Sequence, residues 1–360
     1  MSIKSQQDLI NKLHEMFPDT LTSNTVTREQ ILQVTTYVPS WLSSAKMARG
    51  IYALPGGKVV TPKVEETKVD DSPMVPARDE AYVPFGNFFH LETIIKSQKF
   101  FPAFVTGPTG NGKSTMVEQI CAKHNRPMIR VNLNMMSDEE QLIGTKTLEN
   151  GNVKVVYGPV LIAMKMGAVL LLDEIDAGTA NALLCLQNIL EGKSYYFKLN
   201  NEIIKPAQGF NIIATANSKG KGSEDGRYVG INVLNEAFLE RFPVTFEQDY
   251  PGAKIETKIV TNLMTSYGCY NEKFAEDLVK WADAIRRTFN DGGIDDNMTT
   301  RRLAHIIKAY SIFNDTDYAV QLCCNRFDVT TKTAFLDLYE KICGGNDTPT
   351  EEKSEGPANF

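Results

Sequence analysis

Thr106-Gly-Pro-Thr-Gly-Asn-Gly-Lys-Ser-Thr115 is the stretch that decides the fold of this chain. It follows the apolar run 101–106 and comes just before a helical pattern that starts at Lys113. The spacing GxxxxGK[ST] between a strand and a helix is typical of a loop that binds phosphate, because its glycines let backbone N–H groups converge on phosphate oxygens. The alternative is a chance Gly-rich turn, which the strand–loop–helix context disfavours. The stretch therefore predicts a nucleotide site.

The loop residues have individual predicted roles. We expect Lys113 to reach the β- and γ-phosphates and Ser114 to ligate Mg²⁺. The predicted cofactors are therefore ATP and Mg²⁺. The residues expected to bind ATP are Gly107, Pro108, Thr109, Gly110, Asn111, Gly112, Lys113, Ser114 and Thr115.

A second motif, Val169-Leu-Leu-Leu-Asp-Glu-Ile-Asp176, is an apolar strand that ends in carboxylates. Ligands of open α/β sheets bind at the carboxyl ends of strands. Asp173 is predicted to hold Mg²⁺ through water and Glu174 to act as the general base on the attacking water. An acidic pair that merely caps a strand is the alternative. Asp176 is predicted to be structural.

Three further polar residues follow in the same order along the chain. Asn217 ends the apolar run 210–216 and can orient the attacking water, although an Asn there is usually a turn former. Arg241 ends a short helix, where it either caps the helix or reaches the γ-phosphate of a neighbouring subunit as an arginine finger. Arg301 and Arg302 begin a later helix, and chemistry alone does not choose which of the two faces phosphate.

The pattern between residues 81 and 250 predicts an α/β fold. Short, nearly continuous apolar strands separated by helices indicate a parallel sheet that is covered on both faces. The five predicted strands are 101–106, 127–133, 168–172, 211–216 and 243–246. From residue 252 to residue 343 the pattern is helical only, with helices expected at 272–288, 299–313, 317–324 and 331–342.

Composition changes set the predicted domain boundaries. Residues 1–53 are expected to form a small helical N-terminal domain, and residues 54–80, rich in Pro, Gly and mixed charge, a flexible linker. The α/β nucleotide-binding domain is expected at 81–250 and a helical lid domain at 251–343. The polar tail 344–360 is expected to be disordered.

The overall composition is that of a globular protein. Hydrophobic residues make up 42% and charged residues 23% of the chain, and the formal net charge is −6. The acidic balance argues against a general nucleic-acid coat. The longest apolar runs are too short for a membrane span, and no secretory signal is visible. The six cysteines lack CxxC spacing and there are only four histidines, so we expect reduced thiols, no zinc and a cytoplasmic location.

Taken together, the motifs resemble those of an AAA+ ATPase of the MoxR group, most closely the cobaltochelatase small ATPase subunits (CobS type). The resemblance covers residues 82–313. The stretches that carry it are Ala81-Tyr-Val-Pro84, Thr106–Thr115, Ile129-Arg-Val-Asn-Leu133, Asp173-Glu-Ile-Asp-Ala-Gly178, Ala214-Thr-Ala-Asn217 and Leu234–Phe242.

This resemblance implies roles and an assembly. Lys113 and Ser114 would belong to the Walker A motif, Asp173 and Glu174 to Walker B, Asn217 to sensor 1, Arg241 to the finger and Arg301 to sensor 2. It implies a homo-oligomeric ring, a hexamer, with ATP between subunits. It also implies two hairpins at the pore, for which Glu149-Asn-Gly-Asn152 and Lys198–Ile204 are the candidates. Such ATPases also occur in large tailed phages, so a phage-encoded homologue acting in the host cytoplasm is one expectation.

Two functions remain open after the resemblance. The first is a ring ATPase that remodels a partner protein or complex. The alternative is a DNA-acting motor whose residues 1–53 bind DNA, which Lys58, Lys63, Lys68, Lys219 and Lys221 keep open. The linker mixes acids with these bases and offers no basic stripe, so nucleic acid is possible but not favoured. A scaffold that binds nucleotide without hydrolysing it is disfavoured by the pair Asp173–Glu174.

Overall fold

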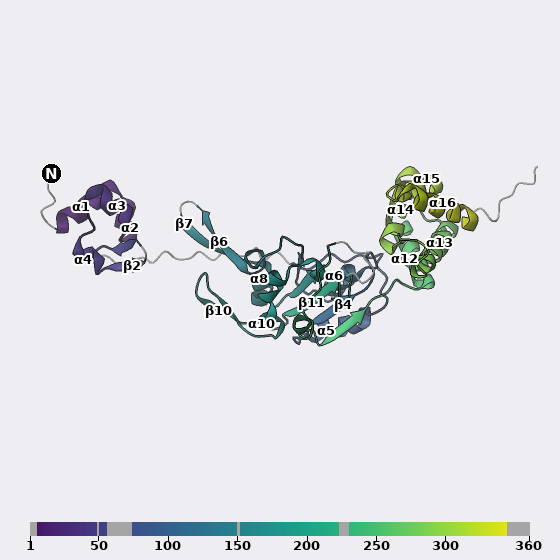
Figure 1. Ribbon diagram of the computed structural model, residues 1–360, viewed down its shortest axis with the longest axis horizontal. Coiled ribbons are helices and arrows are strands. Elements are labelled where there is room, and N and C mark those ends of the chain that lie inside the picture. Colours follow the sequence, from purple (N-terminus) through teal and green to yellow (C-terminus); the bar gives the residue numbers. More distant parts are fainter. Residues whose placement is uncertain (1–5, 49, 56–73, 150–151, 223–229, 344–360) are drawn as a thin grey trace, which may run out of the picture. The chain divides into compact units, whose positions relative to one another are not determined.

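A computed structural model of the chain describes residues 6–48, 50–55, 74–149, 152–222 and 230–343 (Figure 1). The chain divides into two compact units, one made of residues 1–67 with 147–155 and the other of residues 68–146 with 156–360. The predicted tail 344–360 and the larger part of the predicted linker, 56–73, lie outside the described residues.

The N-terminal residues form short helices around a small core. The first helix buries Leu9, Ile10 and Leu13, which lie on one of its faces. Thr27 and Gln30 make a capping box at the start of the third helix, with the Thr27 N–H donating to Gln30 Oε1 at 2.8 Å. The elements are α1 (Gln6–Met16), α2 (Asp19–Ser23), β1 (Thr25–Thr27), α3 (Arg28–Val34), α4 (Ser40–Ser43), β2 (Lys46–Ala48) and β3 (Ile51–Ala53).

Two details of this region correct the sequence analysis. The region is not purely helical, because β1, β3 and β2 form a three-stranded sheet. Strands of three residues are too short to show an alternating pattern, so the sequence hides them. Leu54 also belongs to this core rather than to the linker: it is 3% exposed, and Asn24 Nδ2 donates to its carbonyl at 2.7 Å.

The second unit contains the predicted parallel five-stranded sheet. The strands lie in the order β12-β4-β11-β8-β5, and all four pairings are parallel. Their bounds are β4 (Ala103–Thr106), β5 (Met128–Asn132), β8 (Val169–Asp173), β11 (Asn211–Ala216) and β12 (Val244–Glu247). The fold-class prediction is confirmed. β8 and β11 are buried at every position, which explains their unbroken apolar sequences.

Helices cover the sheet and complete its core (Figure 1). α5 and α6 bury Leu91, Ile95 and Val117 against strand residues such as Val105 and Leu171. The helices of this part are α5 (Phe88–Ser97), α6 (Lys113–Lys123), α7 (Glu139–Ile143), α8 (Pro159–Met166), a 3₁₀ turn (Ile175–Ala177), α9 (Ala180–Leu184), α10 (Gln187–Leu190) and α11 (Glu236–Leu239).

The register of the sheet brings the predicted motifs to one edge. Thr106, at the end of β4, pairs with Ala216 at the end of β11, and Asp173 at the end of β8 pairs with Asn132. Because the strands are parallel, the phosphate loop, Asp173 and Asn217 all emerge at the same carboxyl edge.

Both predicted hairpins are present as two-stranded sheets. One consists of β6 (Gly144–Glu149) and β7 (Asn152–Tyr157), the other of β9 (Tyr195–Phe197) and β10 (Glu202–Ile204). In the second hairpin Glu202 pairs with Phe197, so β10 begins inside the predicted hairpin stretch Lys198–Ile204.

The helices after β12 form a bundle, and the sequence analysis predicts all of them except the first, at residues 253–266. Trp281 lies fully buried at its centre, and its Nε1–H donates to the Phe335 carbonyl at 2.9 Å. The helices are α12 (Ala253–Ser266), α13 (Glu272–Asn290), α14 (Thr300–Phe313), α15 (Thr316–Cys324) and α16 (Val329–Cys343).

Residues 74–80 differ from the predicted flexible linker, because they are hydrogen-bonded to the α/β part. The Met128 N–H donates to the Met74 carbonyl at 2.8 Å, and Gln119 bonds both the Ala77 carbonyl and the Asp79 N–H. These contacts use backbone groups, which every residue carries, so composition cannot reveal them.

Candidate nucleotide-binding site

The phosphate loop joins β4 to α6 in the predicted strand–loop–helix arrangement. Gly107 and Gly110 have φ of +149° and +69°, in a region that side chains rarely adopt. A Cβ on Gly110 would lie only 2.8 Å from the Thr299 side chain, so the loop also needs glycine there for space. Asn111, 2% exposed, donates through Nδ2 to the Gln248 carbonyl and anchors the loop beside β12.

Lys113 is a buried cation whose hydrogen-bond partners are all neutral. Its side chain donates to the Gly107 and Pro108 carbonyls at 2.8 and 2.9 Å, and to Asn217 Oδ1 at 3.2 Å. It also lies 3.3 Å from Asn111 Oδ1. Burial lowers its pKa to about 8, although the nearby charge of Asp173 works in the opposite direction. A buried ammonium group without a bonded carboxylate suits a site for an anion.

Asp173 is the centre of a polar cluster at the end of β8. It accepts hydrogen bonds from Ser114 Oγ at 2.7 Å and from the Thr215 hydroxyl, and Arg130 Nη2 lies 2.5 Å from its Oδ2. Burial opposes ionisation, but the two hydroxyl groups and the Arg130 charge outweigh it and lower the pKa of Asp173. The structure thus brings the two predicted metal-site residues, Ser114 and Asp173, into direct contact.

Glu174 follows Asp173 but has a different environment. Its backbone is left-handed, with φ of +56°, and its side chain is exposed. Its N–H points to Thr215 Oγ1 at 3.4 Å. An exposed carboxylate beside a buried one is free to contact water, which the predicted base requires.

Asp176 holds the segment that carries Asn217. Its Oδ2 accepts the N–H groups of Asn217 and Ser218 and the Ser218 hydroxyl, each at 3.0 Å. It is 1% exposed. These contacts agree with the structural role that the sequence predicts for it.

The fourteen residues around the candidate phosphate pocket come from every predicted motif except the one with Arg241. The pocket has a volume of about 170 Å³. It is lined by Thr109, Gly110, Asn111, Gly112, Lys113, Ser114, Thr115, Arg130, Asp173, Glu174, Thr215, Ala216, Asn217 and Arg301. Gly107 and Pro108 do not line it; they border a neighbouring cavity and hold Lys113 through their carbonyls.

The structure distinguishes the two arginines that the sequence left open. Arg301 lines the pocket, and its N–H donates to the Gly110 carbonyl at 3.2 Å. The Arg302 guanidinium lies instead over the Phe327 ring, 5.9 Å from its centroid. Of the two arginines, Arg301 is therefore the one that lines the candidate phosphate pocket.

Arg241 lies just after α11 and bonds within its own chain. Its Nε is 3.1 Å from Glu191 Oε1, and its Nη1 donates to the Ala237 carbonyl of α11. The second contact is the helix-capping geometry that the sequence analysis gave as an alternative. Arg241 does not contribute to the pocket of its own chain.

Two site residues, Arg130 and Thr215, carry no role in the sequence analysis. Arg130 on β5 connects Asp173 to Glu118, with its Nη1 2.8 Å from Glu118 Oε1. A charged residue inside the short apolar run 127–133 was the available signal for Arg130. Thr215 on β11 gave none, because a threonine is common in strands.

The residues that line the pocket fit a nucleoside triphosphate with magnesium. Lys113 and Arg301 supply positive charge beside backbone N–H groups at the start of α6, which suits phosphate. Within the described residues no group of three or more His, Cys, Asp or Glu could hold a metal by itself. One carboxylate and one hydroxyl are typical of Mg²⁺ sites that are completed by phosphate and water.

Comparison with known proteins agrees with this arrangement. A family model described as "AAA domain (dynein-related subfamily)" matches residues 102–242. The chain is 26% identical to aerobic cobaltochelatase subunit CobS of Sinorhizobium sp. over 77% of this chain and 88% of that protein. It is 32% identical to an uncharacterised protein of Staphylococcus saprophyticus over 54% of this chain and 72% of that one.

The chain belongs to the AAA family, in its dynein-related group, and is a homologue of CobS. Among solved structures, the Thermotoga maritima RuvB Holliday junction branch migration motor is similar at 13% identity and a TM-score of 0.44, over 72% of this chain and 74% of that one. CobS of Sinorhizobium sp. and the Staphylococcus saprophyticus protein are bacterial, and neither supports a phage origin. In the part of the chain that the structure describes, no helix has both the length and the apolar character of a membrane span.

Proposed function

We propose that this protein binds ATP with Mg²⁺ and hydrolyses it to ADP and phosphate. The observation that carries the proposal is the buried Lys113 ammonium group, which is bonded only to neutral oxygens and lines the same pocket as the pair Ser114–Asp173. Family membership adds support, since these residues come from the matched segment 102–242.

The chain's own residues would divide the work as follows. Lys113 and Arg301 bind the phosphates, and Asn217, held through its backbone by Asp176, orients the attacking water. Glu174 takes a proton from that water at its carboxylate. Ser114 and Asp173 would hold Mg²⁺, which supplies charge neutralisation on the phosphate oxygens.

We further propose that the protein works as a homo-oligomeric ring that remodels a protein partner in the cytoplasm. The support is its similarity to the cobaltochelatase subunit CobS over most of both chains. The hexamer, the cobalt pathway and the division of the chain into separate domains stay predictions. The DNA-acting alternative gains nothing from Lys219, because its ammonium lies 2.8 Å from Glu247.

ATP binding and turnover of Lys113→Ala test the function. The variant loses the buried cation, so ATP affinity should fall by about 10- to 150-fold, the worth of one charged hydrogen bond. Lys123→Ala, an exposed lysine on the same helix, is the matched control. Wild-type protein that neither binds nor hydrolyses ATP in Mg²⁺ would overturn the proposal. If ATP binding and turnover are found, a pull-down with Glu174→Gln, which should keep ATP bound, would identify the protein partner.

A further inference from the structure

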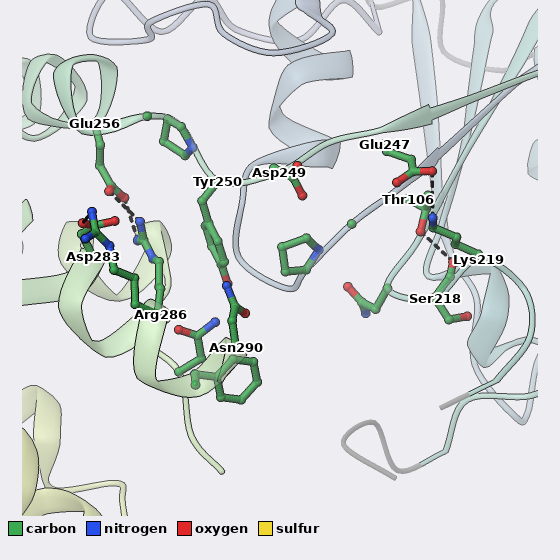
Figure 2. Close-up of a pocket in the computed structure, with 18 of the residues that line it drawn as sticks. Thr106, Ser218, Lys219, Glu247, Asp249, Tyr250, Glu256, Asp283, Arg286 and Asn290 are labelled. Carbon is green, nitrogen blue, oxygen red and sulfur yellow. Dashed lines mark hydrogen bonds and ion pairs between the residues drawn. The ribbon is translucent and has the colours of Figure 1, made fainter. Parts of the chain in front are cut away.

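A second, larger cavity of about 1100 Å³ lies beside the phosphate loop (Figure 2). One wall comes from the ends of β4, β11 and β12, with Thr106, Ser218 and Glu247. The other comes from α12 and α13, with Glu256 and Arg286. The segment 249–252, which includes Tyr250, runs between the two walls.

The α12–α13 wall contains a fully bonded, buried ion pair. Arg286 Nη1 and Nη2 each lie 2.7 Å from a Glu256 oxygen, and the two side chains are 9% and 1% exposed. Arg286 Nε also donates to the Met298 carbonyl at 2.7 Å. Such a pair contributes little net stability, because desolvation offsets the attraction, but it fixes geometry.

This pair holds the start of α14. Thr300 Oγ1 donates to Glu256 Oε1 at 2.6 Å, and the Arg286 Nε bond is to Met298, two residues before Thr300. Arg301 is the next residue. The ion pair therefore fixes the backbone that carries the arginine of the phosphate pocket.

Tyr250 joins this pair to the phosphate loop. The Arg286 guanidinium lies over the Tyr250 ring, 4.2 Å from its centroid, and the Tyr250 hydroxyl donates to the Thr109 carbonyl at 2.8 Å. The next carbonyl, that of Gly110, accepts the Arg301 N–H. Two successive carbonyls of the loop are thus held by Tyr250 and by the start of α14.

These bonds act on the phosphate-binding side of the loop as well. In a trans peptide the C=O and N–H groups point in opposite directions. Holding the Thr109 carbonyl aims the Gly110 N–H the other way, and holding the Gly110 carbonyl does the same for the Asn111 N–H. The orientation of the loop and the position of Arg301 are therefore linked through one aromatic side chain.

We propose that Tyr250 is a positioning residue that couples the phosphate-binding loop to Arg301 through the pair Arg286–Glu256. The proposal rests on the nucleotide site of the proposed function. It predicts that changes at Tyr250 and Arg301 affect ATP affinity non-additively, although no contact between their side chains is needed.

The first experiment measures binding of N-methylanthraniloyl-ATP in Mg²⁺ by fluorescence. Tyr250→Phe keeps the ring and loses one hydrogen bond, so affinity should fall roughly twofold to tenfold. Tyr250→Leu also loses the cation–π contact, so its ATP affinity should fall by a further factor of roughly 2 to 30. In an Arg301→Ala background the Tyr250→Leu loss should shrink at least about threefold. Additive losses, within about twofold, would overturn the coupling.

The second experiment measures hydrogen exchange without nucleotide. Tyr250→Leu should speed exchange in a peptide covering residues 299–304, and Tyr270→Leu, an exposed tyrosine of the same helical region, should not. Unchanged exchange in Tyr250→Leu would also overturn the proposal. This readout does not need ATP binding, so a failed proposed function and a failed coupling give different results. Should Tyr250→Leu not fold, Tyr250→Phe serves in both experiments.

Discussion

The phosphate pocket and the segment after α11 that carries Arg241 differ in how their predicted catalytic residues are arranged. In the pocket, Lys113, Asp173 and Arg301 come from distant parts of one chain and line a common space. In the segment after α11, Arg241 bonds only to Glu191 and to its own helix among the contacts the structure records.

This difference separates the residues that gather around the pocket within one chain from Arg241, which lies outside that pocket. The groups proposed to bind phosphate and metal all line one pocket of a single chain, and they include the cations Lys113, Arg130 and Arg301. An arginine finger acts on the nucleotide of a neighbouring subunit, so its function requires a second copy of the chain. The contacts of Arg241 match the capping alternative, and its role in trans stays a prediction.

The largest expected effect comes from Arg241→Ala. If Arg241 acts as a finger in a ring, ATP should bind within about twofold of wild type, while turnover falls about 10³-fold or more. Mixing these protomers with Lys113→Ala protomers should restore some activity, because one mixed interface joins an intact pocket to an intact finger. Arg287→Ala, which removes an exposed arginine paired with Asp283, is the control. Wild-type turnover by Arg241→Ala protein would leave Arg241 as a helix cap.

Glu174→Gln tests the role of a residue that lines the pocket of its own chain. Because the Glu174 side chain is exposed, its replacement should leave Ser114 and Asp173 in place. ATP affinity should therefore stay within about twofold of wild type, while turnover falls about 10²- to 10⁴-fold. Phosphate release and nucleotide binding, measured side by side, check this. Glu240→Gln, another exposed carboxylate, should behave like wild type. Equal turnover in Glu174→Gln and wild type would contradict the assigned base.

A smaller effect is expected from pH. Because burial lowers the pKa of Lys113 to about 8, the free protein loses this positive charge as the pH rises through that value. ATP favours the charged form, so affinity should fall above about pH 8 by up to tenfold per pH unit, and stay level below it. A titration between pH 7 and 9.5 measures the slope. Lys113→Arg, whose guanidinium keeps its charge, should show no such fall in ATP affinity. An unchanged slope in Lys113→Arg would assign the pH dependence to another group.

The α/β fold was predictable because its signals are local. The run 169–172 and the loop 107–114 each show their structure within a few residues, and both appear as expected. The strands of residues 25–27, 46–48 and 51–53 were missed, because three residues cannot display a period. The contacts of residues 74–80 were missed because they are made by backbone groups.

The same division holds in the site. Sequence spacing alone predicted that Lys113, Ser114, Asp173 and Glu174 belong to one site, and all four line the same pocket. This was possible because each pair lies within a few residues, in the phosphate loop or at the end of one strand. Tertiary structure decided the choice of Arg301 over Arg302, the contact of Arg130 with Asp173, and the link from Tyr250 through Arg286 to Thr300. These residues are separated by tens to more than a hundred positions along the chain. Only the packing of helices and strands sets their distances, and hydrogen bonds and charge interactions depend on those distances.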